Sequence, residues 1–125
     1  MSTFKINYIK FIKELQKQEN ANGKDKYRNL KAIKAGKYML SIQGGSGHYC
    51  SPRQTLPVNL YSEMELAIIN KKYSMISINR SKVFRKFKRY NNLLDRADSL
   101  NSGATVYEYV SVNLLNDLYC FLNEA

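Results

Sequence analysis

The chain has 125 residues, a mass of 14.5 kDa and a formal net charge of +10, and 44% of its residues are hydrophobic. These values predict one domain with a single core, spanning residues 1–125, and argue against a disordered chain. No stretch approaches the roughly eighteen apolar residues of a membrane span, and lysines interrupt the apolar positions of residues 1–15, so neither a membrane contact nor a signal peptide is expected.

Two helices are expected before the first strand. The apolar residues of the first recur at helical spacing behind a capping serine or threonine, and they are Phe4, Tyr8, Phe11, Ile12 and Leu15. The second helix is predicted from Asp25 to Ala35, with Tyr27, Leu30 and Ile33 inward, because Gly36 suits the position just after a helix end.

Alternating apolar residues predict a meander of three strands in the middle of the chain, over residues 37–43, 63–69 and 73–78. Tyr38, Leu40 and Ile42 share one face of the first, and an Asn-Lys-Lys turn connects the second to the third. Residues 105–110 predict a further short strand.

Two helices are expected around that last strand. Ser81 is predicted to cap a basic helix whose inner side carries Val83, Phe84, Phe87 and Tyr90. Ser111 is predicted to cap a final helix. The sequence therefore predicts an α+β fold: a small antiparallel sheet of three to four strands packed with N-terminal, basic and C-terminal helices. One core cluster should collect Phe11, Leu40, Leu66, Phe87 and Leu118.

Positive charge is concentrated in one part of the chain. Residues 1–96 hold all twenty Lys and Arg residues and six acids, whereas residues 97–125 hold four acids and no base. The basic helix is expected to expose the binding candidates Lys82, Arg85, Lys86, Lys88 and Arg89. The electrostatic field of these positive charges would attract a polyanion or an acidic protein. The alternative interpretation is a solvated lysine-rich surface without a partner. The preceding segment is a strand, which argues against a helix-turn-helix.

The loop Gly44–Arg53 is the most unusual stretch, because it gathers three glycines, the only histidine and a cysteine. A structural turn whose tip contacts a partner through His48, Tyr49 and Arg53 is the favoured interpretation. The spacing does not match a phosphate-binding loop. A Cys50–His48 nucleophile lacks a third residue to orient the base. One histidine and two distant cysteines do not supply a zinc site, so no metal or cofactor is expected.

Two further pairs of residues bear on chemistry. Glu63 and Glu65 lie about 7 Å apart on one strand face, a separation that resembles a glycosidase pair. The favoured interpretation is a half-exposed polar face, paired with Arg53 or Lys71. Cys50 and Cys120 are too distant in sequence to suggest a disulfide framework, and a reducing cytoplasm is the expected compartment.

Three segments between residues 41 and 68, a stretch of about a quarter of the chain, carry a resemblance: Ser41–Gln43, His48–Arg53 and Tyr61–Ile68. They resemble small uncharacterised proteins encoded by bacteriophages. The resemblance assigns no catalytic role to any residue of this chain. It implies a compact inhibitor, located in the cytoplasm of a bacterial host, that serves host takeover or counter-defence, as anti-CRISPR proteins do by occupying the surface of a nucleoprotein.

These observations predict a non-enzymatic binding protein of the phage-inhibitor type, which docks a basic surface on a nucleic-acid-processing complex. The contacted partner is an acidic protein surface or a nucleoprotein, with guide RNA and DNA both left open. An autonomous DNA- or RNA-binding regulator is the alternative. A small enzyme using His48, Cys50 and Arg53 is the third hypothesis.

Overall fold

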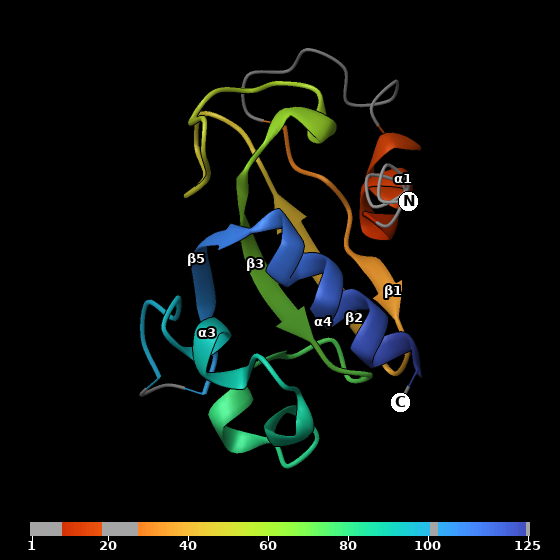
Figure 1. Ribbon diagram of the computed structural model, residues 1–125, viewed down its shortest axis with the longest axis vertical. Helices are drawn as coiled ribbons and strands as arrows, with labels where there is room; N and C mark the ends of the chain where they lie inside the picture. Colours follow the sequence, from red (N-terminus) through yellow and green to blue (C-terminus); the bar gives the residue numbers. More distant parts are fainter. Residues whose placement is uncertain (1–8, 19–27, 101–102, 125) are drawn as a thin grey trace, which may run out of the picture.

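The computed structural model describes residues 9–18, 28–100 and 103–124, and it contains a five-stranded antiparallel sheet (Figure 1). The strands are β1 (Ile33–Ala35), β2 (Tyr38–Gln43), β3 (Glu63–Ile69), β4 (Met75–Ile76) and β5 (Val106–Ser111). Strands β1 to β4 form a meander in chain order, and β5 returns to pair with β3. Because β4 pairs with the last residues of β3 and β5 with the preceding ones, β3 is the central strand. The predicted α+β class is confirmed.

Helices α1 (Lys10–Gln16) and α4 (Val112–Glu124) pack against each other, and Figure 1 shows α4 lying across the sheet. The alternation in β3 explains this packing, because Met64, Leu66 and Ile68 are fully buried while the residues between them are half-buried. The inward residues of sheet and helices form one hydrophobic cluster. All five predicted core residues belong to it: Phe11, Leu40, Leu66, Phe87 and Leu118.

The first predicted helix is confirmed where the structure describes it, since Phe11, Ile12 and Leu15 are buried on α1. Its expected cap and the positions of Phe4 and Tyr8 lie outside the described residues.

The second predicted helix is wrong over its described part, because Ile33–Ala35 forms strand β1 and pairs with β2. Asp25 and Tyr27 lie outside the described residues. Gly36 has a φ of 62° and occupies a two-residue hairpin turn, where a left-handed glycine fits as well as it does after a helix. A Cβ on Gly36 would lie 2.1 Å from the Leu122 carbonyl oxygen, so helix α4 also requires glycine there.

The predicted basic helix is also wrong, because the segment is broken into a 3-10 turn at Phe84–Lys86 and the short helix α3 (Tyr90–Leu94). Phe87 between them is extended, with φ −72° and ψ 125°. The break lets Phe84 pack edge-on against Tyr38 while Phe87 packs against Phe121, two partners on different elements. Val83, which was expected to point inward, is 39% exposed.

The remaining elements differ less from expectation. Strand β4 is only two residues long, and the chain turns into a 3-10 helix at Ile78–Arg80 before Ser81, which caps no helix. The predicted cap of the final helix is confirmed, since the Ser111 hydroxyl accepts a hydrogen bond from the Leu114 N–H at 3.2 Å. Among the described helices, none combines the length and apolar character needed to span a membrane.

Candidate functional site

The predicted site residues fall into two groups at opposite ends of the sheet. His48, Tyr49 and Arg53 lie in the loop that precedes β3, and the five basic residues follow β4, which pairs with the end of β3. Figure 1 shows the first group above the sheet and the second below it. From the strand rise, β3 separates them by roughly 20 Å. They therefore form two surfaces and not one site.

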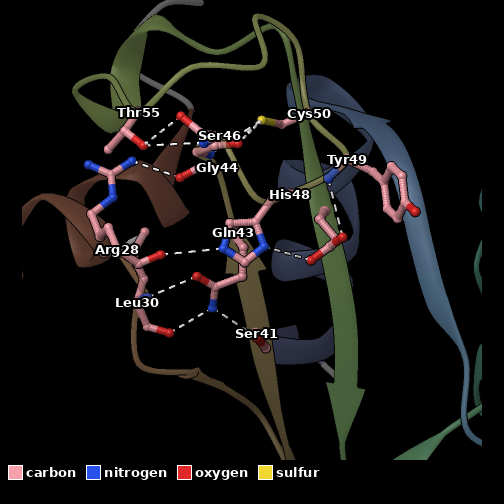
Figure 2. Close-up of polar contacts among 12 residues, drawn as sticks. Arg28, Leu30, Ser41, Gln43, Gly44, Ser46, His48, Tyr49, Cys50 and Thr55 are labelled. Carbon is pink, nitrogen blue, oxygen red and sulfur yellow. Dashed lines mark hydrogen bonds and ion pairs between the residues drawn. The ribbon is translucent and has the colours of Figure 1, made fainter. Parts of the chain in front are cut away.

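His48 is hydrogen-bonded through both ring nitrogens (Figure 2). Nδ1 lies 2.9 Å from Oε1 of Glu65, and Nε2 lies 3.3 Å from the Arg28 carbonyl oxygen. A carboxylate and a carbonyl only accept hydrogen bonds, so both contacts are satisfied together only when the imidazole carries both protons. The hydrogen bond with Glu65 raises the pKa of His48 above its ordinary value, against the opposing effect of partial burial.

Glu65 completes this contact from strand β3. Its second oxygen accepts a hydrogen bond from the Tyr49 N–H at 3.2 Å. Burial acts to raise the pKa of this carboxyl, but the hydrogen bonds from His48 and from the Tyr49 backbone outweigh burial, and the pKa is lowered. Glu63 accepts from the Ser51 hydroxyl at 2.9 Å. The two glutamates thus make their hydrogen bonds with His48, the Tyr49 N–H and Ser51, and not with the expected Arg53 or Lys71.

The thiol of Cys50 points away from His48, toward the glycine turn (Figure 2). Its sulfur lies 3.3 Å from both the N–H and the carbonyl oxygen of Gly45, and 3.3 Å from the Pro52 carbonyl oxygen. Burial raises the pKa of this thiol, which disfavours the thiolate that a nucleophile needs. Cys120 is half-buried, and both thiols are free. The geometry therefore gives no support to the Cys–His hypothesis.

A buried arginine that was not among the predicted site residues anchors the loop. Arg28 is 2% exposed, and its Nη2 donates to the Gly44 carbonyl at 3.0 Å and to the Tyr61 hydroxyl at 3.2 Å. Gln43 holds the same segment, because its side-chain amide makes two hydrogen bonds to the backbone of Leu30, at 2.8 and 2.7 Å. No sequence signal marks Arg28, since its partners lie sixteen and thirty-three positions away.

The tip of the loop remains at the surface. Tyr49 is 40% exposed, and the guanidinium carbon of Arg53 lies 4.9 Å from the centre of its ring. The Tyr109 ring lies 6.0 Å from that of Tyr49, centre to centre. Of the three loop residues predicted to contact a partner, His48 is engaged inside the protein, and Tyr49 and Arg53 face solvent.

The basic segment presents its charges outward. Lys82, Arg85, Lys86 and Lys88 are exposed, as expected, and Arg89 is half-buried. Two of the five are tied to neighbours. These are Arg89, which pairs with Asp117 of α4 at 2.9 Å, and Arg85, which donates to the Asn79 carbonyl at 3.0 Å. The ammonium groups of Lys82, Lys86 and Lys88 make no ion pair within residues 9–18, 28–100 and 103–124.

An apolar hollow adjoins Lys86. It has a volume of about 450 Å³ and is lined by Lys37, Tyr38, Val83, Lys86, Phe121 and Leu122. It explains why Val83 is exposed: this side chain forms part of the wall of the hollow. Lys37 and Tyr38 were predicted as strand residues and not as site residues, because only the tertiary packing of Tyr38 against Phe84 brings them beside the basic segment.

The described residues contain no cluster of three or more side chains suited to hold a metal ion. Comparison of the chain with protein-family models, with curated proteins and with solved structures finds no match. One of the two surfaces is a loop closed by internal hydrogen bonds, and the other is a set of exposed ammonium groups around an apolar hollow.

Proposed function

We propose that the protein is a non-enzymatic binder that docks its basic surface on a nucleic-acid-processing complex, as an inhibitor of the phage type. We define the basic surface as Lys82, Lys86 and Lys88 with the adjoining hollow. The observation that supports this most is that these three ammonium groups are exposed and make no ion pair with the described residues. An anionic partner is the natural complement of such a surface.

The hollow adds an apolar component to this electrostatic attraction. Rims of charge around an apolar centre are typical of protein interfaces, where the centre contributes affinity and the rim contributes orientation and association rate. Val83 and Phe121 supply that centre here, next to Lys86. The surface therefore fits a nucleoprotein, which offers both phosphate and protein groups. The inhibitory role rests on the resemblance to phage proteins.

The loop around His48 supports binding over catalysis. An active site needs a nucleophile or base that can reach a substrate. The imidazole of His48 is occupied on both nitrogens, and the Cys50 thiol is buried among backbone atoms.

The test is affinity capture from bacterial lysate, with and without nuclease, followed by measurement of the affinity of the captured complex. Reversing Lys82, Lys86 and Lys88 to Glu should leave folding nearly intact and lower that affinity at least tenfold at low salt. The matched control reverses Lys10, Lys13 and Lys31, which are also exposed, and so makes the same change in net charge elsewhere. The control variant should bind within about threefold of the parent.

Two outcomes would contradict the proposal. If the triple reversal at Lys82, Lys86 and Lys88 binds as tightly as the parent, the basic surface is not the docking site. If both triple reversals lose binding equally, net charge and not this surface is responsible. A gel shift with duplex DNA, single strands and RNA at physiological salt identifies the alternative, because an autonomous regulator retards naked nucleic acid.

A further inference from the structure

The turn between β3 and β4 holds one aromatic ring in solvent. Tyr73 is 88% exposed, the most of any large hydrophobic side chain in the described residues. Its φ of 62° lies in the left-handed region, which bulky residues rarely adopt and which glycine or asparagine usually occupies. An exposed aromatic in a strained conformation points to a role outside the fold, because neither feature helps packing.

Hydrogen bonds order the backbone of the turn that carries Tyr73. The Asn70 side-chain oxygen accepts hydrogen bonds from the N–H groups of Lys72 and Ser74, at 2.9 and 3.0 Å. The Asn70 backbone closes the same turn, donating to the Ser74 carbonyl at 2.9 Å and accepting from the Tyr73 N–H at 3.0 Å. These four hydrogen bonds fix the backbone that presents Tyr73.

Lysines surround this ring. Two hollows, of about 470 and 320 Å³, lie between the β1–β2 turn and the β3–β4 turn. Both are lined by Lys37, Tyr38, Asn70 and Lys71; Lys34 and Tyr73 line the larger one, and Lys72 lines the smaller. All four lysines are exposed. Among the described residues that line either hollow, none is acidic.

The hollows continue toward the basic surface. Lys37 and Tyr38 also line the 450 Å³ hollow beside Lys86, so the three hollows meet at these two residues. We refer to these three hollows together as the trough; Tyr73 lines one of them and Lys86 lines another. Cations beside an exposed aromatic ring are the groups by which proteins hold single-stranded nucleic acid.

We propose that this trough binds a single-stranded segment of nucleic acid, with one base stacked on Tyr73 and phosphates held by Lys34, Lys37, Lys71 and Lys72. This inference rests on the proposed function, because the single strand would belong to the nucleic-acid-processing complex on which the basic surface docks. A duplex would leave the ring without a partner, because its bases are already stacked on one another. An acidic protein would engage the ammonium groups but not require a flat exposed ring.

The experiment is fluorescence anisotropy with three labelled probes: a twelve-nucleotide oligo-dT, the corresponding oligo-U, and a twelve-base-pair duplex. The single strands should bind the parent protein more tightly than the duplex. Tyr73→Gly should weaken single-strand binding about tenfold or more, the usual effect of removing one stacking partner, while Tyr73→Phe retains it. Replacing Lys71 and Lys72 by Gln should reduce the log–log salt slope by about 0.7 for each phosphate that is no longer neutralised.

Two controls separate binding from folding. Glycine adopts a positive φ without steric cost, so the melting temperature of Tyr73→Gly should equal or exceed that of the parent. The control Leu60→Ala removes another exposed large hydrophobic side chain, which is 56% exposed and lines none of the three hollows, and it should bind the probes as the parent does. Tighter binding of duplex than of single strand, or an unchanged affinity in Tyr73→Gly, would overturn the proposal. If the oligonucleotide test fails but capture of the partner still depends on Lys82, Lys86 and Lys88, the single-strand proposal is wrong and the proposed function is retained.

Discussion

The loop before β3 and the turns after it use their polar side chains in opposite ways. His48 in the loop contacts Glu65 of β3 and the Arg28 carbonyl, and the Arg28 side chain donates to the Gly44 carbonyl and to the Tyr61 hydroxyl. Beyond the other end of β3, Lys71, Lys72 and Lys86 face solvent around hollows. The loop is the more unusual stretch in sequence, yet its unusual residues serve the fold. Ordinary lysines are the groups left available to a partner.

This difference has an energetic consequence. A buried or half-buried hydrogen-bonded group costs stability when its partner is removed, because the remaining group loses its solvation as well as its bond. An exposed lysine makes little difference to folding when it is replaced. Substitutions in the loop should therefore change stability, and substitutions at the lysines should change binding.

The largest effect should come from the core beneath the basic segment. Phe87 is 5% exposed, and its ring centre lies 5.2 Å from that of Phe121, so Phe87→Ala should lower the free energy of unfolding by about 3–5 kcal/mol. Val83→Ala, in the same segment but exposed, should cost less than about 1 kcal/mol. Denaturant unfolding of both variants checks this. Equal losses would show that the segment packs as a continuous helix after all.

The next effect concerns the pair of His48 and Glu65. Glu65→Gln should cost about 1–3 kcal/mol near pH 6, since it removes the carboxylate charge and replaces one of two accepting oxygens by an NH2 group, so that His48 or the Tyr49 N–H loses its acceptor. Because the pKa of His48 is raised by folding, its contribution is fully present below about pH 6.5 and is lost as the pH rises through the folded-state pKa. Because the pKa of Glu65 is lowered, its contribution is lost as the pH falls through that pKa.

The free energy of unfolding of the parent, measured from pH 3 to pH 9, should therefore pass through a maximum. This maximum should be flatter in the Glu65→Gln variant. His48 is the only histidine, so NMR reports its pKa without ambiguity. That pKa should fall toward its ordinary value in the variant. A parent pKa equal to that in the denatured chain would mean that the loop is open at this contact, and the comparison between the two ends of β3 would fail.

A smaller effect of opposite sign is expected at the β3–β4 turn. Tyr73→Gly relieves a left-handed conformation that costs a non-glycine residue about 1 kcal/mol or more, partly offset by the greater freedom of glycine in the unfolded chain. The net result should be stabilisation of up to about 1 kcal/mol, measured by denaturant unfolding. Destabilisation would show that the Tyr73 ring packs against the protein and is not held out for a ligand.

The smallest effect tests which predicted site residues belong to the fold. Arg89→Gln breaks the exposed ion pair with Asp117 and should cost about 0.2–1 kcal/mol at low salt, falling toward zero at 1 M salt. Lys88→Gln, the adjacent control without a described ion pair, should leave the free energy of unfolding nearly unchanged. If the two variants cannot be told apart at low salt, Arg89 is as available to a partner as its neighbours.

Much of the fold was predictable because its signals are local. The strands β2 and β3 follow from alternation over six and seven residues, β5 follows from its content of strand-forming residues, and the cap at Ser111 follows from residue type. Strand β1 was not predictable in this way. Ile33–Ala35 is too short to show a period, and its conformation depends on pairing with β2. The break at Phe87 likewise depends on Tyr38 and Phe121, which lie far away in sequence.

For the candidate sites, the sequence by itself determined the excess of positive charge, because charge is a property of the chain. Lys82, Arg85, Lys86 and Lys88 are exposed as expected although the predicted helix is broken, because charged side chains are rarely buried without a partner. Only the tertiary structure decided that His48 and Arg89 are engaged internally, and that Lys37 joins the lysines after β4 around Tyr38. These residues lie seventeen to forty-nine positions apart in the sequence. Sheet pairing and core packing bring them together, and a local sequence pattern does not predict either.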